Sequence, residues 1–162
     1  MKIAYIAAGA AGMYCGTCIH DNTLVASMQK KGHDVALIPT YTPLRTDEEN
    51  VSLNRVFYGG VNVYLQQKLA LFRYTPWFLD RFLDSETLLK SLVRFSSSTN
   101  AKDLGALTIS MLEGEEGHQK KELKKLIKWL KDEYKPDIVQ LTNSMFVGLA
   151  REIKNALGVP VL

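Results

Sequence analysis

The sequence of 162 residues predicts an α/β fold in which a doubly wound, mostly parallel sheet is covered by helices. Three observations predict it. Short apolar runs alternate along the chain with segments of helical periodicity. Glycines follow two of the expected helices, at Gly32 and Gly158, where a left-handed helix stop is wanted. The run at 35–39 is apolar throughout, which is typical of a parallel strand buried on both faces.

The first β-α-β unit occupies residues 2–39. We expect a strand at 2–8, a glycine-bearing turn at 9–18, a helix at about 17–31 and a second strand at 35–39. Such a turn can bring bare backbone N–H groups and a helix N-terminus to an anion, usually a phosphate. The turn is therefore the first candidate site.

The middle of the chain departs from simple strand–helix alternation. Residues 53–58 and 61–66 are separated by Gly59 and Gly60, which predicts a β-hairpin at the edge of the sheet. A helical insert follows, from about 68 to 113. It is larger than a minimal crossover requires, so we expect it to carry specificity or an interface.

The last third returns to alternation. The pattern predicts a helix at 117–134, a buried strand at 138–141, a polar turn at 142–144 and a helix at 145–157. Residues 158–162 have the pattern of a further strand that is cut off, so we expect a piece of a longer protein. Together the elements predict one Rossmann-like domain over residues 1–162.

Ligands of such sheets lie beyond the carboxyl ends of the strands, which selects the turns after Ala8, Pro39 and Leu141. The first turn lacks the glycine spacing of a dinucleotide fingerprint, and no Gly-Lys-Ser/Thr motif occurs. What remains is a turn that offers backbone donors to a ligand. The alternative is that its glycines only allow the strand and helix to pack closely.

The polar residues near this edge have two interpretations each. Cys15 and Cys18 have the spacing of thioredoxin-like redox pairs at a helix start, or they are small packing residues. His20 either hydrogen-bonds a sugar or phosphate or is a half-exposed helix residue. Asp21, which we expect in the first helical turn, can simply complement the helix dipole. One Cys-x-x-Cys is weak support for zinc, so we predict no metal site and no cofactor.

The charge and hydropathy of the sequence indicate the compartment and the kinds of partner that we expect. The net charge of +3 does not argue for nucleic acid, and no apolar run has the ~18 residues of a membrane span. The N-terminus does not resemble a signal peptide, so we expect a cytoplasmic protein with reduced thiols. Six lysines lie on the helix at 117–134: Lys120, Lys121, Lys124, Lys125, Lys128 and Lys131. They form a solvated face or, as the alternative, rest peripherally on the inner face of an anionic membrane beside the aromatic residues Trp77, Phe78 and Phe82.

Two blocks of the sequence resemble a known family. Residues 2–38, KIAYIAAGAAGMYCGTCIHDNTLVASMQKKGHDVALI, look like the opening of a GT-B glycosyltransferase of family 4. Residues 135–162, KPDIVQLTNSMFVGLAREIKNALGVPVL, resemble a later block of the same family. They contain Pro-Asp, an apolar strand, a polar turn, a helix and Gly-Val-Pro-Val. The two blocks cover about half the chain, in the expected order.

The resemblance implies the acceptor-side, N-terminal domain of a hexosyltransferase. The family transfers a sugar from a nucleotide-diphosphate sugar to an acceptor, here a sugar or a lipid-linked molecule, between two Rossmann-like domains. The donor-binding C-terminal domain would be the missing partner, so we expect this part alone to be inactive. By the resemblance the substrate-binding residues are Gly12, Gly16, Thr17, His20, Thr142 and Asn143, with no catalytic residue assigned.

The sequence also departs from the family. Many members carry histidines after the Pro-Asp strand, where this chain has Gln140 and Thr142, and many have Gly-Gly where it has Cys15 and Gly16. Two alternatives therefore stay open. One is a non-catalytic nucleotide- or sugar-binding α/β domain, and the other is a thioredoxin-like redox protein that uses Cys15 and Cys18.

Overall fold

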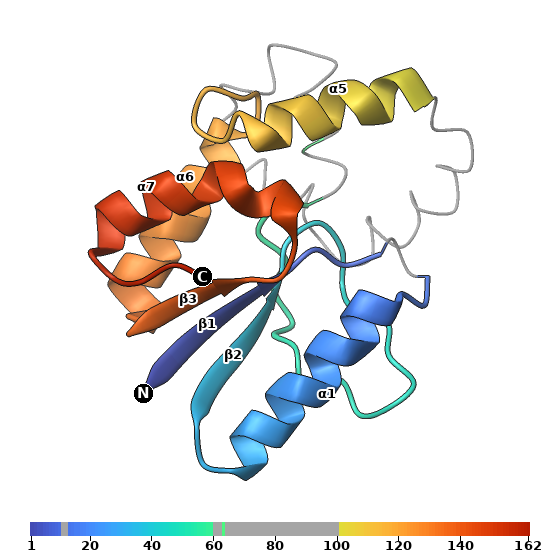
Figure 1. Ribbon diagram of the computed structural model, residues 1–162, viewed down its shortest axis with the longest axis vertical. Helices are drawn as coiled ribbons and strands as arrows, with labels where there is room; N and C mark the ends of the chain where they lie inside the picture. Colours follow the sequence, from blue (N-terminus) through green and yellow to red (C-terminus); the bar gives the residue numbers. More distant parts are fainter. Residues whose placement is uncertain (11–12, 60–62, 64–100) are drawn as a thin grey trace.

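A computed structural model describes residues 1–10, 13–59, 63 and 101–162, with only the backbone described at 101–104 (Figure 1). The strands are β1 (Lys2–Ala7), β2 (Asp34–Pro39) and β3 (Ile138–Leu141). The helices are α1 (Gly16–Lys30), α5 (Ala101–Leu112), α6 (Lys120–Trp129) and α7 (Val147–Leu157). A π-helical turn, Leu130–Tyr134, extends α6, and a 3-10 turn, Ser144–Phe146, precedes α7.

The three strands form an all-parallel sheet in the order β2-β1-β3. Ile6 of β1 lies opposite Ile38 of β2 and Leu141 of β3. Single parallel bridges continue the pairing outward, from Leu37 to Ser52 and from Val139 to Val161. The predicted strands at 2–8, 35–39 and 138–141 are confirmed to within a residue, and the start of a strand near the C-terminus is confirmed as a bridge.

Alternate side chains of β1 pack into two hydrophobic cores, one on each face of the sheet. Ile3, Tyr5 and Ala7 pack with Cys18 and Val25 of α1. On the other face Ala4 and Ile6 of β1 pack with buried residues of α6 and α7: Leu123, Leu126, Leu149 and Ile153. Helices therefore cover both faces of the sheet, α1 one face and α6 with α7 the other (Figure 1). The predicted α/β class is confirmed, and the arrangement is compatible with a Rossmann-like fold.

The helix ends follow the glycine pattern in two places and depart from it in a third. Gly32 and Gly158 have positive φ angles of 85° and 68°, as predicted for left-handed stops. The helix expected over 117–134 begins at Lys120 and turns π-helical at Leu130. It then ends on Lys135, a non-glycine residue with φ of 54°. No glycine follows that helix, so a lysine adopts the left-handed conformation instead.

The predicted β-hairpin is wrong in the part that the structure describes. Residues 53–58 form no strand; only Ser52 makes a bridge, and that bridge is parallel. The backbone N–H of Val63 donates to the carbonyl of Gly59 at 2.9 Å, which is a helical spacing and not a cross-strand pair. Gly59 therefore lies in front of a helical turn and does not end a strand. Most of the second arm, and 68–100 of the helical insert, lie outside the described residues.

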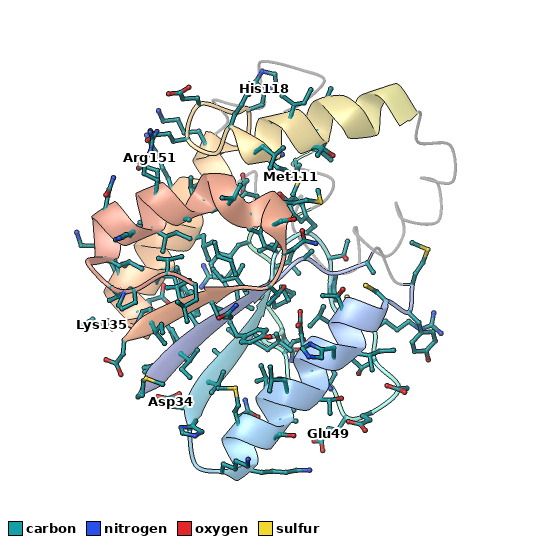
Figure 2. All side chains as sticks on the ribbon, in the orientation of Figure 1. Asp34, Glu49, Met111, His118, Lys135 and Arg151 are labelled. Carbon is teal, nitrogen blue, oxygen red and sulfur yellow. The ribbon has the colours of Figure 1, made fainter. Side chains whose placement is uncertain are left out.

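The described end of the insert, α5, packs against the start of α7 (Figure 1). Gly148 of α7 lies so close to the carbonyls of Met111 and Leu112 that a Cβ atom there would overlap them. Gly114 has a φ of 58° and faces the backbone of Gly148 in the same way. Figure 2 shows Asp34 and Lys135 at the amino end of the sheet, with Met111 beyond the opposite end. Helix α5 therefore flanks the edge where ligands are expected.

Candidate functional site

Three loops meet at the carboxyl edge of the sheet. The backbone N–H of Thr40, after β2, donates to Ala7, and that of Tyr41 donates to Ala8, at 2.9 and 3.0 Å. On the other side of β1, the N–H of Thr142 donates to Ile6 at 3.2 Å. The chain runs from β1 to β2 on one side and later returns to place β3 on the other side of β1. The strand order therefore reverses at β1. Ligands of open α/β sheets bind at such a reversal.

The turn after β1 begins with Gly9, which has no room for a side chain because Thr42 lies against it. Gly9 has a φ of 80°, and a Cβ atom on it would come within 2.6 Å of Thr42 Oγ1. Gly9 is therefore required for the close approach of the loop after β2, and this contact is not the packing of strand against helix that the alternative interpretation expects. Gly12, which was predicted to bind the substrate, lies outside the described residues.

The N-terminus of α1 presents Gly16 and Thr17, two of the expected substrate-binding residues, to solvent. Cys15 occupies the N-cap with extended backbone angles, and its side chain makes no full capping hydrogen bond. The first N–H groups of a helix have no partner within the helix. This N-terminus therefore keeps donors that an anion can use, strengthened by the dipole of a 15-residue helix.

The turn after β3 holds Thr142 and Asn143 beside β1. Asn143 Oδ1 accepts from the N–H of Met145 at 2.9 Å and so caps the 3-10 turn. This is a structural role, which the position of an asparagine before a helix could have indicated. Thr142 Oγ1 is buried and has no hydrogen-bond partner. Thr142 therefore keeps the polar capacity that a ligand would need, whereas the carbonyl oxygen of the Asn143 side chain is already used.

His20 lies one turn along α1 from Gly16, with its side chain 71% exposed. Its Nδ1 is 3.2 Å from Asp21 Oδ1. An exposed imidazole next to a carboxylate has its other nitrogen available to solvent or to a ligand. The structure thus places His20 on the same helix as Gly16 and Thr17, though outside the first turn.

Asp21 is a buried residue that the sequence interpretation missed. Since α1 begins at Gly16, Asp21 is in the second turn and not the first, so its expected role of complementing the helix dipole is wrong. The residue is only 2% exposed, and Tyr5 Oη donates to its Oδ1 at 3.2 Å. Its Oδ2 has no hydrogen-bond partner. Cys18, Asp21, Asn22 and Val25 form the buried face of α1, but two of them are polar, so hydrophobic periodicity does not reveal this face from the sequence.

Burial and Asp21 together affect the neighbouring titratable groups. The pKa of Tyr5 is raised to about 12 by burial first and then by the Asp21 carboxylate, which repels a phenolate. The pKa of Cys18 is also raised to about 12, by burial first, then by Cys15 and Asp21. The pKa of Cys15 is lowered, mainly because the backbone N–H of Cys18 stabilises the thiolate. The two thiols thus differ strongly in acidity.

Comparisons with protein-family models, with curated proteins and with solved structures found no match to this chain. Within the described residues, no group of three or more His, Cys, Asp or Glu side chains is placed to hold a metal ion. Nor does any described helix combine the length and apolar character that crossing a membrane requires. The function is therefore argued from the chemistry of this edge of the sheet.

Proposed function

We propose that this chain is the acceptor-side, Rossmann-like domain of a GT-B sugar transferase that uses a nucleotide-diphosphate sugar as donor. A second, donor-binding domain would supply the other wall of the cleft. The acceptor would be a sugar or a lipid-linked molecule. In this proposal the chain acts in the cytoplasm, and the domain alone does not turn over substrate.

The reversal of strand order at β1 supports the proposal most. On one side of it the N-terminus of α1 offers donors at Gly16 and Thr17, and on the other Thr142 follows β3. Sugar transfer builds negative charge on the departing diphosphate. Helix dipoles and fixed backbone donors stabilise such charge without reorganising. An edge of this kind suits a diphosphate better than an apolar ligand.

The remaining residues have narrower roles in the proposal. His20 and Thr142 would hydrogen-bond sugar hydroxyls, while Asn143 would hold the turn after β3 in place through its cap on Met145. Gly12 belongs to the proposed anion site by its position in the first turn. No residue is assigned as a catalytic acid, base or nucleophile.

Contact with an anionic membrane through α6 is a lesser proposal. Two of its lysines already have acidic partners, since Lys125 pairs with Glu122 at 3.1 Å and Lys128 with Asp132 at 2.6 Å. Exposed Lys120 and Lys124 remain on the same helix. Sedimentation with phosphatidylserine vesicles, compared with neutral vesicles, tests it, and binding that is insensitive to lipid charge would contradict it.

Titration of the isotope-labelled chain with a nucleotide-diphosphate sugar, followed by amide chemical shifts, tests the anion site. The largest shifts are expected at Gly16 and Thr17. Thr17→Asp places a carboxylate where the diphosphate would bind and should weaken binding by about tenfold or more. The variant should still fold, because an acidic residue near the start of a helix is favourable for the helix dipole. Ser27→Asp, near the other end of α1, is the matched control and should bind as the wild type does.

Shifts that spread over the lysines of α6, or equal weakening by both aspartate variants, would show general charge attraction instead. Inorganic phosphate in a parallel titration separates phosphate binding from recognition of the sugar. If phosphate alone reproduces every shift, the sugar makes no contact and the transferase proposal loses its main support.

A further inference from the structure

Cys15, Cys18 and Asp21 follow one another at intervals of three along the start of α1, so they lie on neighbouring turns of one side of the helix. We propose that Cys15 and Cys18 are a dithiol site that exchanges with small disulfides, and that Asp21 accepts the proton of Cys18 during the exchange. The inference does not rest on the proposed sugar transfer.

Cys15 has the properties of the attacking thiol. It is half-buried at the N-cap, beside the exposed residues Tyr14 and Gly16, so a small reagent can reach it. The N–H groups of Cys18 and Thr17 lower its pKa, which raises the fraction present as thiolate at neutral pH. A thiolate at a helix N-terminus is the usual nucleophile in thiol–disulfide exchange.

Cys18 has the properties of the resolving thiol. It is 3% exposed within the core between α1 and β1, so a dissolved disulfide cannot reach it directly. Cys15 is the N-cap of α1 and Cys18 is the third residue of the helix, which is the Cys-x-x-Cys spacing of dithiols that form a disulfide. Burial also keeps Cys18 protonated, so it needs a nearby base before it can attack.

We assign Asp21 as that base, because it is buried three residues beyond Cys18 on the same helix, where side chains are neighbours. A buried carboxylate normally has all its oxygens hydrogen-bonded, yet Asp21 Oδ2 has no partner. The other oxygen, Oδ1, receives Tyr5 Oη and lies next to His20 Nδ1. The charge of Asp21 acts on Cys18, and exposed His20 offers the proton a route to solvent. A role in proton transfer would explain a buried carboxylate with one oxygen, Oδ2, left without a hydrogen bond.

The exchange balances with a small disulfide, such as oxidised glutathione, as the oxidant. The Cys15 thiolate attacks one sulfur, a mixed disulfide forms and one glutathione thiolate leaves. Cys18 then gives its proton to Asp21, and its sulfur attacks Cys15 and expels the second glutathione. Two protein thiols are oxidised by two electrons to one disulfide, and the oxidised glutathione is reduced to two thiols.

The first test equilibrates the wild-type chain with mixtures of reduced and oxidised glutathione, then alkylates the free thiols and measures intact mass. A single two-electron transition that links Cys15 to Cys18 is expected. Cys18→Ala should stop at a Cys15–glutathione adduct, and Cys15→Ser should not react. A wild type that keeps both thiols across all mixtures, or a Cys15→Ser variant that is modified at Cys18 without unfolding, overturns the proposal.

The second test isolates Asp21 as a positioning and proton-accepting group. Asp21→Asn keeps an oxygen for Tyr5 but removes the base, so release of the second glutathione should slow by about 100-fold while adduct formation at Cys15 is unchanged. Glu48→Gln, on the loop beside α1, is the control and should change neither rate. Equal slowing of both steps by Asp21→Asn, or no slowing, contradicts the role of Asp21. If that variant does not fold, Asp21→Glu, which keeps the carboxylate, replaces it and must retain the fast second step.

Discussion

The side-chain amide of Asn22 donates a hydrogen bond to the backbone carbonyl of Glu49 at 2.9 Å. Its Oδ1 also accepts from the N–H of Val51 at 3.0 Å, so one buried side chain joins α1 to the loop after β2. Asn22→Ala would leave a partly buried backbone donor and acceptor without their partner. We expect it to lower the free energy of unfolding by about 2–4 kcal/mol, measured in urea.

Thr23→Ala is the matched control for Asn22, because Thr23 contacts the same loop through Glu48 but from an exposed position. Exposed substitutions of this kind change stability by about 0.5 kcal/mol or less. Equal effects of the two variants would mean that the loop contributes no buried hydrogen bonds to stability.

Gly148 and Gly105 are expected to respond in opposite ways to alanine. Both lie within helices, where alanine is favoured over glycine by about 1 kcal/mol. At Gly105 nothing lies within 4 Å of the added Cβ, so Gly105→Ala should stabilise the protein. At Gly148 the Cβ would overlap the carbonyls of Leu112 and Met111, so Gly148→Ala should destabilise it by about 1–3 kcal/mol. Thermal unfolding of the two variants measures the difference in sign.

A stabilising effect at both glycines would show that the end of α5 does not pack closely on α7. That result would also contradict the position of α5 beside the carboxyl edge of the sheet.

Cys15 and Cys18 are also predicted to differ when replaced by serine. Serine is among the preferred N-cap residues, whereas Cys15 makes no full cap, so Cys15→Ser should stabilise the protein by about 0.5–1 kcal/mol. Cys18→Ser puts a hydroxyl into an apolar core and should destabilise it by about 1–3 kcal/mol. Urea unfolding under reducing conditions measures both. Destabilisation by Cys15→Ser would mean that the thiol has a packing role at the N-cap.

Strands and helix stops were predictable because each depends on local chemistry. The run at 138–141 forms the expected strand, although only Val139 is fully buried, and Gly32 and Gly158 adopt the φ angles that a left-handed stop requires. The hairpin prediction also relied on local chemistry alone, and there local chemistry was not enough. Two glycines permit many turns, and the choice between a hairpin and a helical turn after Gly59 depends on tertiary contacts.

The candidate site was predictable only in part. The rule on carboxyl ends selected the turns after the three strands, and hydrogen bonds from Thr40 and Thr142 to the end of β1 bring two of these turns to one edge. That Gly16 and Thr17 bind substrate there stays a prediction. The burial of Asp21 was not predictable from its charge, since acidic residues are seldom buried. Its environment comes from Tyr5, sixteen residues earlier on the neighbouring strand. That Gly12 and Asn143 bind the same substrate stays a prediction, since Gly12 lies outside the described residues.

Tyr5 should make stability fall at alkaline pH. Its pKa is raised from 10.0 to about 12 in the fold, so the folded protein keeps a proton that the unfolded chain releases. Its contribution is therefore fully present below pH 10.0 and is lost as pH rises toward about 12. Tyr5→Phe should reduce this alkaline loss, measured by urea unfolding across that range, although Tyr41, Tyr58 and Tyr134 also have raised pKa values and keep part of it.

At neutral pH the same Tyr5→Phe variant removes the only hydroxyl that donates to Asp21 among the described contacts. A buried acceptor that loses its donor destabilises a fold by about 1–3 kcal/mol. Tyr14→Phe is the control, since Tyr14 is 57% exposed and should tolerate the change at neutral pH. If Tyr5→Phe is as stable as the wild type at neutral pH and loses stability as steeply in alkali, then the hydrogen bond from Tyr5 to Asp21 contributes nothing to the fold, and Tyr5 does not hold Asp21 in place.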